Sequence, residues 1–211
     1  GLAFDGDADR CFLIDELGGL VNPSALTALI AVRELKANPG ASIIYNLISS
    51  KAVPEVISEN GGTALRSRVG HSYIKSLMAE SGAIFGGEHS GHFYFGDFWR
   101  ADSGMLAALY ALAELMATSK PLSNLLKPYN RYFSSGEINS KVKDAKKSIN
   151  LIREKYQGSY QVDELDGLTI TADTWWFNLR SSNTEPLLRL NVEANTEKQM
   201  AEIRDTVLAL I

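Results

Sequence analysis

The chain has 211 residues, of which 45% are hydrophobic and 22% are charged, and its formal net charge is −4. This length suffices for one or two domains with buried cores, and the composition excludes collagen-like, disordered and disulfide-rich classes. No apolar run approaches the roughly 18 residues of a membrane span, and no broad basic field exists to attract nucleic acid. We therefore expect small anions as partners, with no nucleic acid and no membrane.

Two further features concern the compartment and the completeness of the chain. The single cysteine, Cys11, excludes an internal disulfide and a cysteine-based zinc site, and it is compatible with a reducing, cytoplasmic location. The first residue is Gly1, and no basic leader region follows it, so we expect an incomplete chain without a signal peptide.

The first half of the sequence alternates helical patterns with short apolar strands, which is typical of an α/β domain. The strands are brief and strongly apolar, so we expect a sheet that is covered on both faces. The spacing predicts helices over 22–36, 51–60, 72–81 and 102–119, and strands over 42–48, 63–66 and 83–85.

The pattern changes between Lys127 and Gly136, and this change predicts a domain boundary. Beyond it, strands joined by short turns indicate an antiparallel sheet with helices on one face, a small α+β domain. The expected strands are 137–142, 168–172, 175–179 and 187–194, and the expected helices are 145–156 and 196–211.

The first chemical segment is the acidic loop Asp5–Arg10, which follows a short apolar stretch. Carboxylates at alternating positions need a cation to sit close together, and an oxygen-only ligand set selects a hard ion such as Mg²⁺. A calcium loop or a solvated acidic turn is the alternative, but an EF-hand needs a bidentate glutamate seven residues further on, and the intervening Cys11–Ile14 is typical of a strand. Arg10 either clamps a phosphoryl oxygen or only balances the aspartates.

The second segment is Gly86–His92, which again follows a predicted strand. Its glycines expose backbone donors, and its carboxylate, hydroxyl and two imidazoles are suitable partners for sugar hydroxyls and for proton transfer. Zinc is disfavoured because the spacing lacks the helical His-Glu-x-x-His pattern. His89 has an alternative interpretation as a structural residue.

The third segment is Arg180–Pro186, between two predicted strands. A guanidinium, hydroxyls, an amide and turn-exposed backbone N–H groups together make a plausible phosphate cradle. The same residues also suit a plain hairpin turn, and the segment alone does not decide between the two interpretations.

Taken in order, these segments resemble the α-D-phosphohexomutase superfamily, most closely its bacterial phosphomannomutase/phosphoglucomutase branch. The resemblance covers essentially the whole chain. It rests on the metal loop 5–10, the turn 68–72, the sugar loop 87–91 and the phosphate loop 180–184. It implies an enzyme that interconverts hexose 6-phosphate and hexose 1-phosphate, with Mg²⁺ as cofactor and a hexose 1,6-bisphosphate intermediate.

The resemblance also implies roles for particular residues. It assigns Mg²⁺ to Asp5, Asp7 and Asp9, and catalytic contacts to Arg10, His71 and His92, with His92 as a candidate proton shuttle. It assigns sugar hydroxyls to Glu88 and Ser90, and the phosphate that is not reacting to Arg180, Ser182, Asn183 and Thr184. Some relatives carry lysine where this sequence has Ile48, so that contact is either absent or made by Lys51.

The family plan implies three parts of the chain: 1–19 as a remnant of the second α/β domain, 20–133 as a mixed-sheet third domain, and 134–211 as the C-terminal α+β domain. The Ser-His-Asn-Pro type loop that carries the family's phosphoserine does not occur in the sequence. We therefore expect a fragment that at most binds phosphosugar weakly. We also expect residues 1–19 to be poorly ordered or to borrow the sheet of a neighbouring molecule.

Two other classes of function stay open. One is a metal-dependent phosphatase with Asp5 as nucleophile, because Asp-x-Asp after a strand also begins such enzymes. The other is a non-catalytic module that binds sugar phosphates. The sequence does not distinguish mannose from glucose, and it leaves the oligomeric state open.

Overall fold

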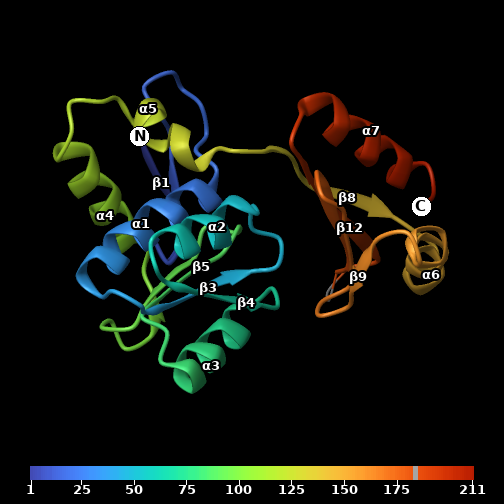
Figure 1. Ribbon diagram of the computed structural model, residues 1–211, viewed down its shortest axis with the longest axis horizontal. Coiled ribbons are helices and arrows are strands. Elements are labelled where there is room, and N and C mark those ends of the chain that lie inside the picture. Colours follow the sequence, from blue (N-terminus) through green and yellow to red (C-terminus); the bar gives the residue numbers. More distant parts are fainter. Residues whose placement is uncertain (183–184) are drawn as a thin grey trace. The chain divides into compact units, whose positions relative to one another are not determined.

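The structure is a computed structural model that describes residues 1–182 and 185–211. The chain divides into two compact units, unit 1 (Gly1–Arg131) and unit 2 (Tyr132–Ile211), whose elements are labelled in Figure 1. None of the helices in the described part of the chain combines the length and the apolar character that a membrane crossing requires.

Unit 1 is built on a mixed five-stranded sheet with the order β4-β3-β5-β6-β7. The β4, β3 and β5 strands are parallel, whereas β6 and β7 continue the sheet in antiparallel fashion. The strands are β3 (Ser42–Asn46), β4 (Thr63–Ser67), β5 (Phe85–Gly87), β6 (Phe93–Phe95) and β7 (Ala101–Asp102). The helices are α1 (Pro23–Ala37), α2 (Ala52–Glu59), α3 (His71–Ser81), α4 (Gly104–Met116) and α5 (Leu122–Leu126), followed by the short 3-10 helix η1 (Lys127–Tyr129).

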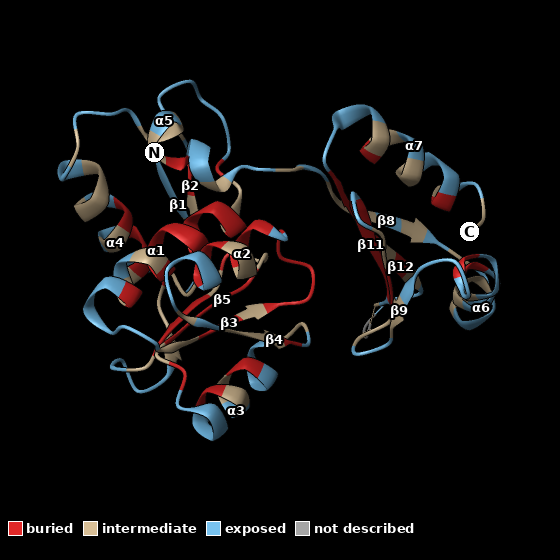
Figure 2. Cartoon of the chain, viewed as in Figure 1, coloured by how far each residue is buried: buried red, intermediate tan, exposed pale blue. Residues whose placement is uncertain are grey.

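Both faces of this sheet are covered, because neighbouring residues of a strand point to opposite faces. In β3, Ile43 belongs to the apolar cluster that includes α1 and α4, whereas Ile44 packs with Ile74 and Met78 of α3. Figure 1 accordingly shows α1 and α2 on one side of the sheet and α3 on the other. Figure 2 shows that much of α1 is buried, and every residue from Ser24 to Ala31 belongs to its buried part.

A two-stranded antiparallel sheet of β1 (Leu2–Phe4) and β2 (Cys11–Leu13) begins the chain. The expectation that residues 1–19 are poorly ordered or borrow a sheet is wrong. Cys11 and Leu13 are buried in the apolar cluster that contains α1 and α4, so unit 1 itself supplies the packing for this hairpin.

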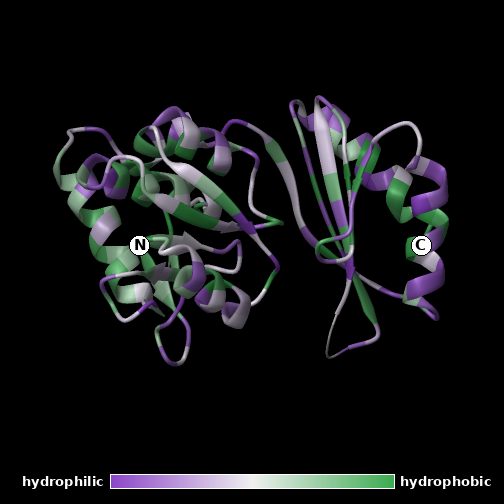
Figure 3. Cartoon of the chain, turned by 60° about the horizontal axis from the view of Figure 1, so that its bottom comes forward, coloured by the Kyte–Doolittle hydropathy of each residue, from purple (hydrophilic) through white to green (hydrophobic). Residues whose placement is uncertain are grey.

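Unit 2 is an antiparallel sheet with the order β8-β12-β11-β10-β9 and two helices. The strands are β8 (Phe133–Lys141), β9 (Gln161–Asp163), β10 (Leu168–Thr171), β11 (Trp175–Ser181) and β12 (Leu187–Ala194); the helices are α6 (Ala145–Tyr156) and α7 (Glu197–Leu208). One face of the sheet packs its apolar residues with Ile152 of α6 and Val207 of α7. Figure 3 shows the resulting alternation of hydrophobic and hydrophilic residues.

Most predicted elements are present, and two are confirmed residue for residue, α6 over 145–156 and β12 over 187–194. The helix predicted over 102–119 begins at Gly104 because Ser103 is its N-cap, whose side chain accepts from Leu106 N. The strand predicted at 83–85 is instead β5, Phe85–Gly87. The absence of a side chain on Gly87 lets β5 lie against Thr27 of α1, because a Cβ on Gly87 would lie 2.3 Å from Thr27 Oγ1.

Candidate functional site

The metal loop, Asp5–Arg10, connects β1 to β2 and places its three aspartates together. One carboxylate oxygen from each of Asp5, Asp7 and Asp9 lies within 4.8 Å of the others. The backbone turns at Ala8, whose φ is 59°, and Ala8 N donates to Asp5 O. The loop therefore turns with Ala8, a residue other than glycine, in the left-handed region.

The chemistry of this loop fits a hard divalent cation. Burial, together with the carboxylates of Asp5 and Asp7, raises the pKa of Asp9, and the nearby His92 opposes this rise only in part. Asp9 Oδ1 is buried and accepts no hydrogen bond from any group in the described part of the chain. An oxygen-only cluster with unused acceptor capacity is what Mg²⁺ prefers, so the residues fit that ion.

Arg10 lies against the aspartates. Its Nε is 3.0 Å from Asp5 Oδ2, and its backbone N donates to Asp5 Oδ1 at 3.2 Å. Nearly half of the Arg10 side chain is exposed, so the guanidinium is accessible to an anion while it balances the acidic loop.

The sugar loop follows β5, and its Glu88 is buried with only 2% of its surface exposed. The Glu88 carboxylate accepts hydrogen bonds from Tyr94 Oη (2.7 Å), from the backbone N of Gly70 (3.1 Å) and from Asn46 Nδ2 (3.4 Å). Burial and the Glu88 carboxylate both raise the pKa of Tyr94. Glu88 thus ties the sugar loop to the turn that begins α3 at His71.

His92 connects the sugar loop to the metal loop. Its Nδ1 lies 2.9 Å from Ser90 Oγ, and its Nε2 lies 3.5 Å from Asp9 Oδ1. The backbone continues the connection, because Cys11 N donates to Gly91 O at 3.0 Å and an isolated bridge pairs Arg10 with His92. The two loops therefore form one centre in unit 1, as their chemistry suggested but their sequence separation could not show.

Two residues of this centre were missed by sequence reasoning. Asp102, at the end of β7, has a carboxylate oxygen within 4.8 Å of ligand atoms of Asp9 and His92. Lys75 of α3 forms an ion pair with Asp102, with Nζ 2.8 Å from Oδ1. Asp102 suggested only a helix start, and Lys75 lies on a helix with no local motif.

Three other residues of unit 1 were named in the sequence analysis, one as a site residue and two as alternatives for a lysine contact. His71 is the exposed first residue of α3 and follows Gly70, whose backbone N donates to Glu88. Ile48 is buried and Lys51 is the exposed residue before α2, so Ile48 is part of the core.

The phosphate loop belongs to unit 2, and Arg180 is part of β11 rather than of a turn. Arg180 is buried and forms an ion pair with Glu137 of β8. Ser182 Oγ accepts from Arg189 Nη2 at 3.3 Å, whereas Asn183 and Thr184 lie outside the described residues. Sequence reasoning missed Glu137 and Arg189, because they come from other strands and carry no motif.

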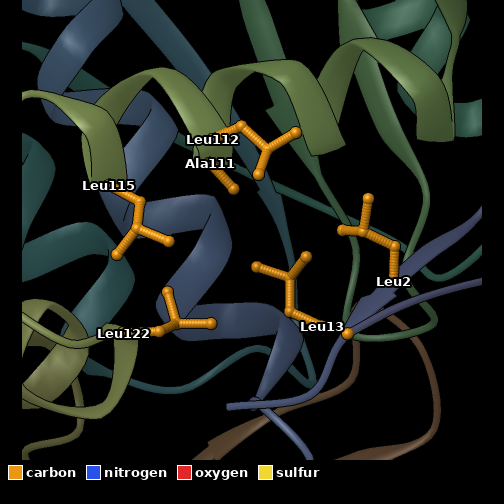
Figure 4. Close-up of a pocket in the computed structure, with 7 residues that line it drawn as sticks. Leu2, Leu13, Ala111, Leu112, Leu115 and Leu122 are labelled. Atoms are coloured by element: carbon orange, nitrogen blue, oxygen red, sulfur yellow. The ribbon is translucent and has the colours of Figure 1, made fainter. Parts of the chain in front are cut away.

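An apolar pocket in unit 1 lies apart from this chemistry. Figure 4 shows its lining by Leu2, Leu13, Ala111, Leu112, Leu115 and Leu122, with Gly1 completing the set. Such a lining offers no side-chain hydrogen-bond partner for a sugar phosphate. The acidic centre and not this pocket is therefore the candidate site of unit 1.

Unit 1 thus combines a mixed α/β sheet with an acidic loop, and unit 2 combines an antiparallel α+β fold with a buried arginine near the end of β11. Residues 22–132 match the family model described as phosphoglucomutase/phosphomannomutase, alpha/beta/alpha domain III. Residues 137–210 match the model of the C-terminal domain of the same proteins. The chain belongs to the phosphoglucomutase/phosphomannomutase family.

Individual relatives agree with this assignment. A phosphomannomutase of Methanocaldococcus jannaschii is 47% identical over 211 residues, covering the whole chain and 47% of the relative. A crystal structure of a family protein from Burkholderia thailandensis is 33% identical with a TM-score of 0.87, covering 100% of this chain and 45% of that chain. The chain spans about half the length of the curated relatives it matches.

A more distant structure shares the fold. It is an N-acetylphosphoglucosamine mutase from Aspergillus fumigatus in complex with GlcNAc-6P and magnesium. It is 12% identical, with a TM-score of 0.71, and the match covers 99% of this chain and 51% of that chain.

Proposed function

We propose that this chain provides three of the sites with which a phosphohexomutase interconverts hexose 6-phosphate and hexose 1-phosphate through a hexose 1,6-bisphosphate. The observation that carries the proposal is the single centre formed by the metal loop and the sugar loop. A cation site next to a loop suited to hydroxyl groups is what phosphoryl transfer to and from a sugar needs. The relatives named phosphomannomutase support the same activity.

In this proposal Asp5, Asp7 and Asp9 hold Mg²⁺. The bound ion would supply charge neutralisation for the transferring phosphoryl group. The distant mutase described with magnesium supports this choice of metal, as does the oxygen-only ligand set.

The neighbouring side chains of unit 1 handle the phosphoryl group, the sugar hydroxyls and the proton. Arg10 assists the phosphoryl group with its exposed guanidinium edge. Glu88 and Ser90 contact sugar hydroxyls, and Tyr94, Gly70 and Asn46 hold the Glu88 carboxylate in place. His92, oriented by Ser90, moves a proton at its ring nitrogens, and His71 contacts the substrate.

Unit 2 contributes the grip on the phosphate that is not reacting, through Arg180, Ser182, Asn183 and Thr184. Binding energy from this remote phosphate fixes the reacting end of the sugar. The sequence contains no Ser-His-Asn-Pro type loop to carry a phosphoserine, so we expect this chain alone to bind phosphosugar without turnover.

Two further points belong to the same proposal. We propose a cytoplasmic location, supported by a single, buried and unpaired cysteine. The comparisons support neither of the other classes, a metal-dependent phosphatase or a non-catalytic binding module, and a phosphatase would leave the sugar and phosphate loops without a role.

The proposal predicts that an Arg180→Ala variant binds glucose 1-phosphate and mannose 1-phosphate at least about tenfold more weakly than the unchanged chain. A charge-assisted, bidentate phosphate contact contributes roughly 1.5–3 kcal/mol, which corresponds to about 10- to 100-fold in affinity. Isothermal titration calorimetry with and without Mg²⁺ measures this difference.

Arg204→Ala is the matched control, because Arg204 is an arginine of the same unit that pairs with Asp205 on α7. Glucose without phosphate is the ligand control, and it should not bind. Equal affinity of the Arg180 variant and the unchanged chain would contradict the proposed phosphate grip. Turnover by this chain alone at the rate of a complete relative would contradict the expected absence of the nucleophile.

A further inference from the structure

A single carboxylate in unit 2 lies between two guanidinium groups. Glu137 Oε2 is 2.9 Å from Arg180 Nη2, and Glu137 Oε1 is 3.4 Å from Arg189 Nη1. The Arg180 side chain is 9% exposed, and those of Glu137 and Arg189 are about one quarter exposed. Glu137 therefore uses both of its oxygens to bridge two arginines.

The strand register explains why these three side chains meet. Arg180 of β11 is directly opposite Arg189 of β12, so the two point to the same face of the sheet. Glu137 of β8 is opposite Asn191, two residues from Arg189, and the two-residue period of a strand places it on that face as well. This is the face opposite to the apolar residues that pack with α6 and α7.

The Glu137 carboxylate reduces the electrostatic cost of placing Arg180 and Arg189 next to each other. Like charges directly opposite each other on neighbouring strands repel, and a buried guanidinium without a counter-charge is costly. Glu137 offsets both effects and leaves the trio with a net charge of +1. The two guanidiniums are thus held together while the site remains attractive to a phosphate dianion.

Both guanidinium groups also have a nitrogen that Glu137 does not contact. The Nε atoms of Arg180 and Arg189 are buried and have no hydrogen-bond partner within residues 1–182 and 185–211. Arg189 also donates to Ser182 Oγ, which connects the trio to the phosphate loop itself. Glu137 therefore contacts one terminal nitrogen of each guanidinium, Arg180 Nη2 and Arg189 Nη1, and no Nε.

We propose that Glu137 is a positioning residue of the phosphate grip, which fixes Arg180 in the orientation that binds the phosphate of the substrate. This inference rests on the proposed function, because it assumes that Arg180 binds phosphate. Glu137 acts through Arg180 and does not itself contact the ligand.

The proposal makes a prediction with a definite sign for Glu137→Gln, a variant that keeps the size of the side chain and removes its charge. If Glu137 only competed with phosphate, its neutralisation would raise the local charge by one and tighten binding. Because it positions Arg180, we expect affinity for inorganic phosphate and for glucose 1-phosphate to fall by about tenfold. Isothermal titration calorimetry on the full chain measures both ligands.

A second readout follows the arginine directly. In the unchanged chain, NMR spectra should show a resolved, slowly exchanging Nε–H signal for Arg180, assigned by its loss in Arg180→Ala. That signal should broaden or disappear in Glu137→Gln. Glu164→Gln is the matched control, because it removes the carboxylate that pairs with Arg153 elsewhere in unit 2, and it should leave the Arg180 signal and the phosphate affinity unchanged.

The outcomes separate the two proposals. Unchanged or tighter phosphate binding in Glu137→Gln, or an unaltered Arg180 signal, would overturn the positioning role even if the proposed function holds. Phosphate binding that does not depend on Arg180 would contradict the proposed function, and it would overturn this inference with it.

If Glu137→Gln does not fold, Glu137→Asp replaces it. That variant keeps the charge but shortens the reach by one methylene, and the same two readouts apply.

Discussion

A Gly104→Ala variant is expected to lose about 3 kcal/mol of unfolding free energy in unit 1, because a new methyl group would collide with the metal loop. A Cβ at this position would lie 2.4 Å from Arg10 O and 2.9 Å from Ala8 O. Both are backbone atoms, so either the loop or the start of α4 has to move. The hydrogen bond from Gly104 N to Ala8 O, at 3.2 Å, would be disrupted by the same movement.

Urea denaturation with pulsed hydrogen exchange, which follows peptides of the two units separately, measures this loss. Gly6→Ala is the matched control within the same loop, because a Cβ on Gly6 would meet nothing within 4 Å. Equal stability of the two variants would contradict the close packing of α4 against the metal loop.

The second large effect is expected for Glu88→Ala, which should destabilise unit 1 by about 3 kcal/mol. The substitution leaves a cavity and removes the acceptor for Tyr94 Oη, Gly70 N and Asn46 Nδ2 at a site that is almost fully buried. A buried donor without a partner costs roughly 1–3 kcal/mol, and the Gly70 N–H has no freedom to turn elsewhere.

Three matched variants sharpen this test under the same denaturation conditions. Glu80→Ala removes an exposed carboxylate of α3 and should change stability by less than about 0.5 kcal/mol. Glu88→Gln should be milder than Glu88→Ala, because the Tyr94 hydroxyl can rotate to accept from the new amide. Tyr94→Phe should lose only about one hydrogen bond, roughly 1 kcal/mol. A Glu88→Ala variant as stable as Glu80→Ala would show that the buried network does not hold the sugar loop.

Local signals made much of the fold predictable. Asp144 precedes the amphipathic run of α6, and its side chain accepts from Lys147 N as the N-cap. Alternation of apolar and polar residues likewise predicts β12. In both elements the residues that set the boundary are neighbours in the sequence, which is why the pattern suffices.

Other elements depend on contacts between distant residues and were not predictable in the same way. Gly87 of β5 lies tightly against α1, because a Cβ on it would be 2.3 Å from Thr27 Oγ1, and Thr27 is far from Gly87 in the sequence. The short strands β6 and β7 have two or three residues, which is too few for a periodic pattern.

The residues of the candidate site also fall into two groups, those recognisable from a local motif and those brought together only by the fold. The aspartates of the metal loop could be predicted because their alternate spacing carries the chemistry within six residues. Asp102 and Lys75 could not, since the fold alone brings them near His92 and Asp9. Glu137 is similar, because only the pairing of β8 with β12 and of β12 with β11 places it beside Arg180.

The most direct test of the account is a titration with Mn²⁺, a paramagnetic substitute for Mg²⁺, followed by two-dimensional NMR of the backbone amides. We predict that the amide signals of Asp5–Arg10 broaden first and that those of His92 and Asp102 follow, because the fold gathers these residues around the three aspartates. An Asp7→Asn variant should need a higher Mn²⁺ concentration for the same broadening. Broadening that spares the metal loop, or that leaves His92 unaffected, would contradict a single cation and sugar centre in unit 1.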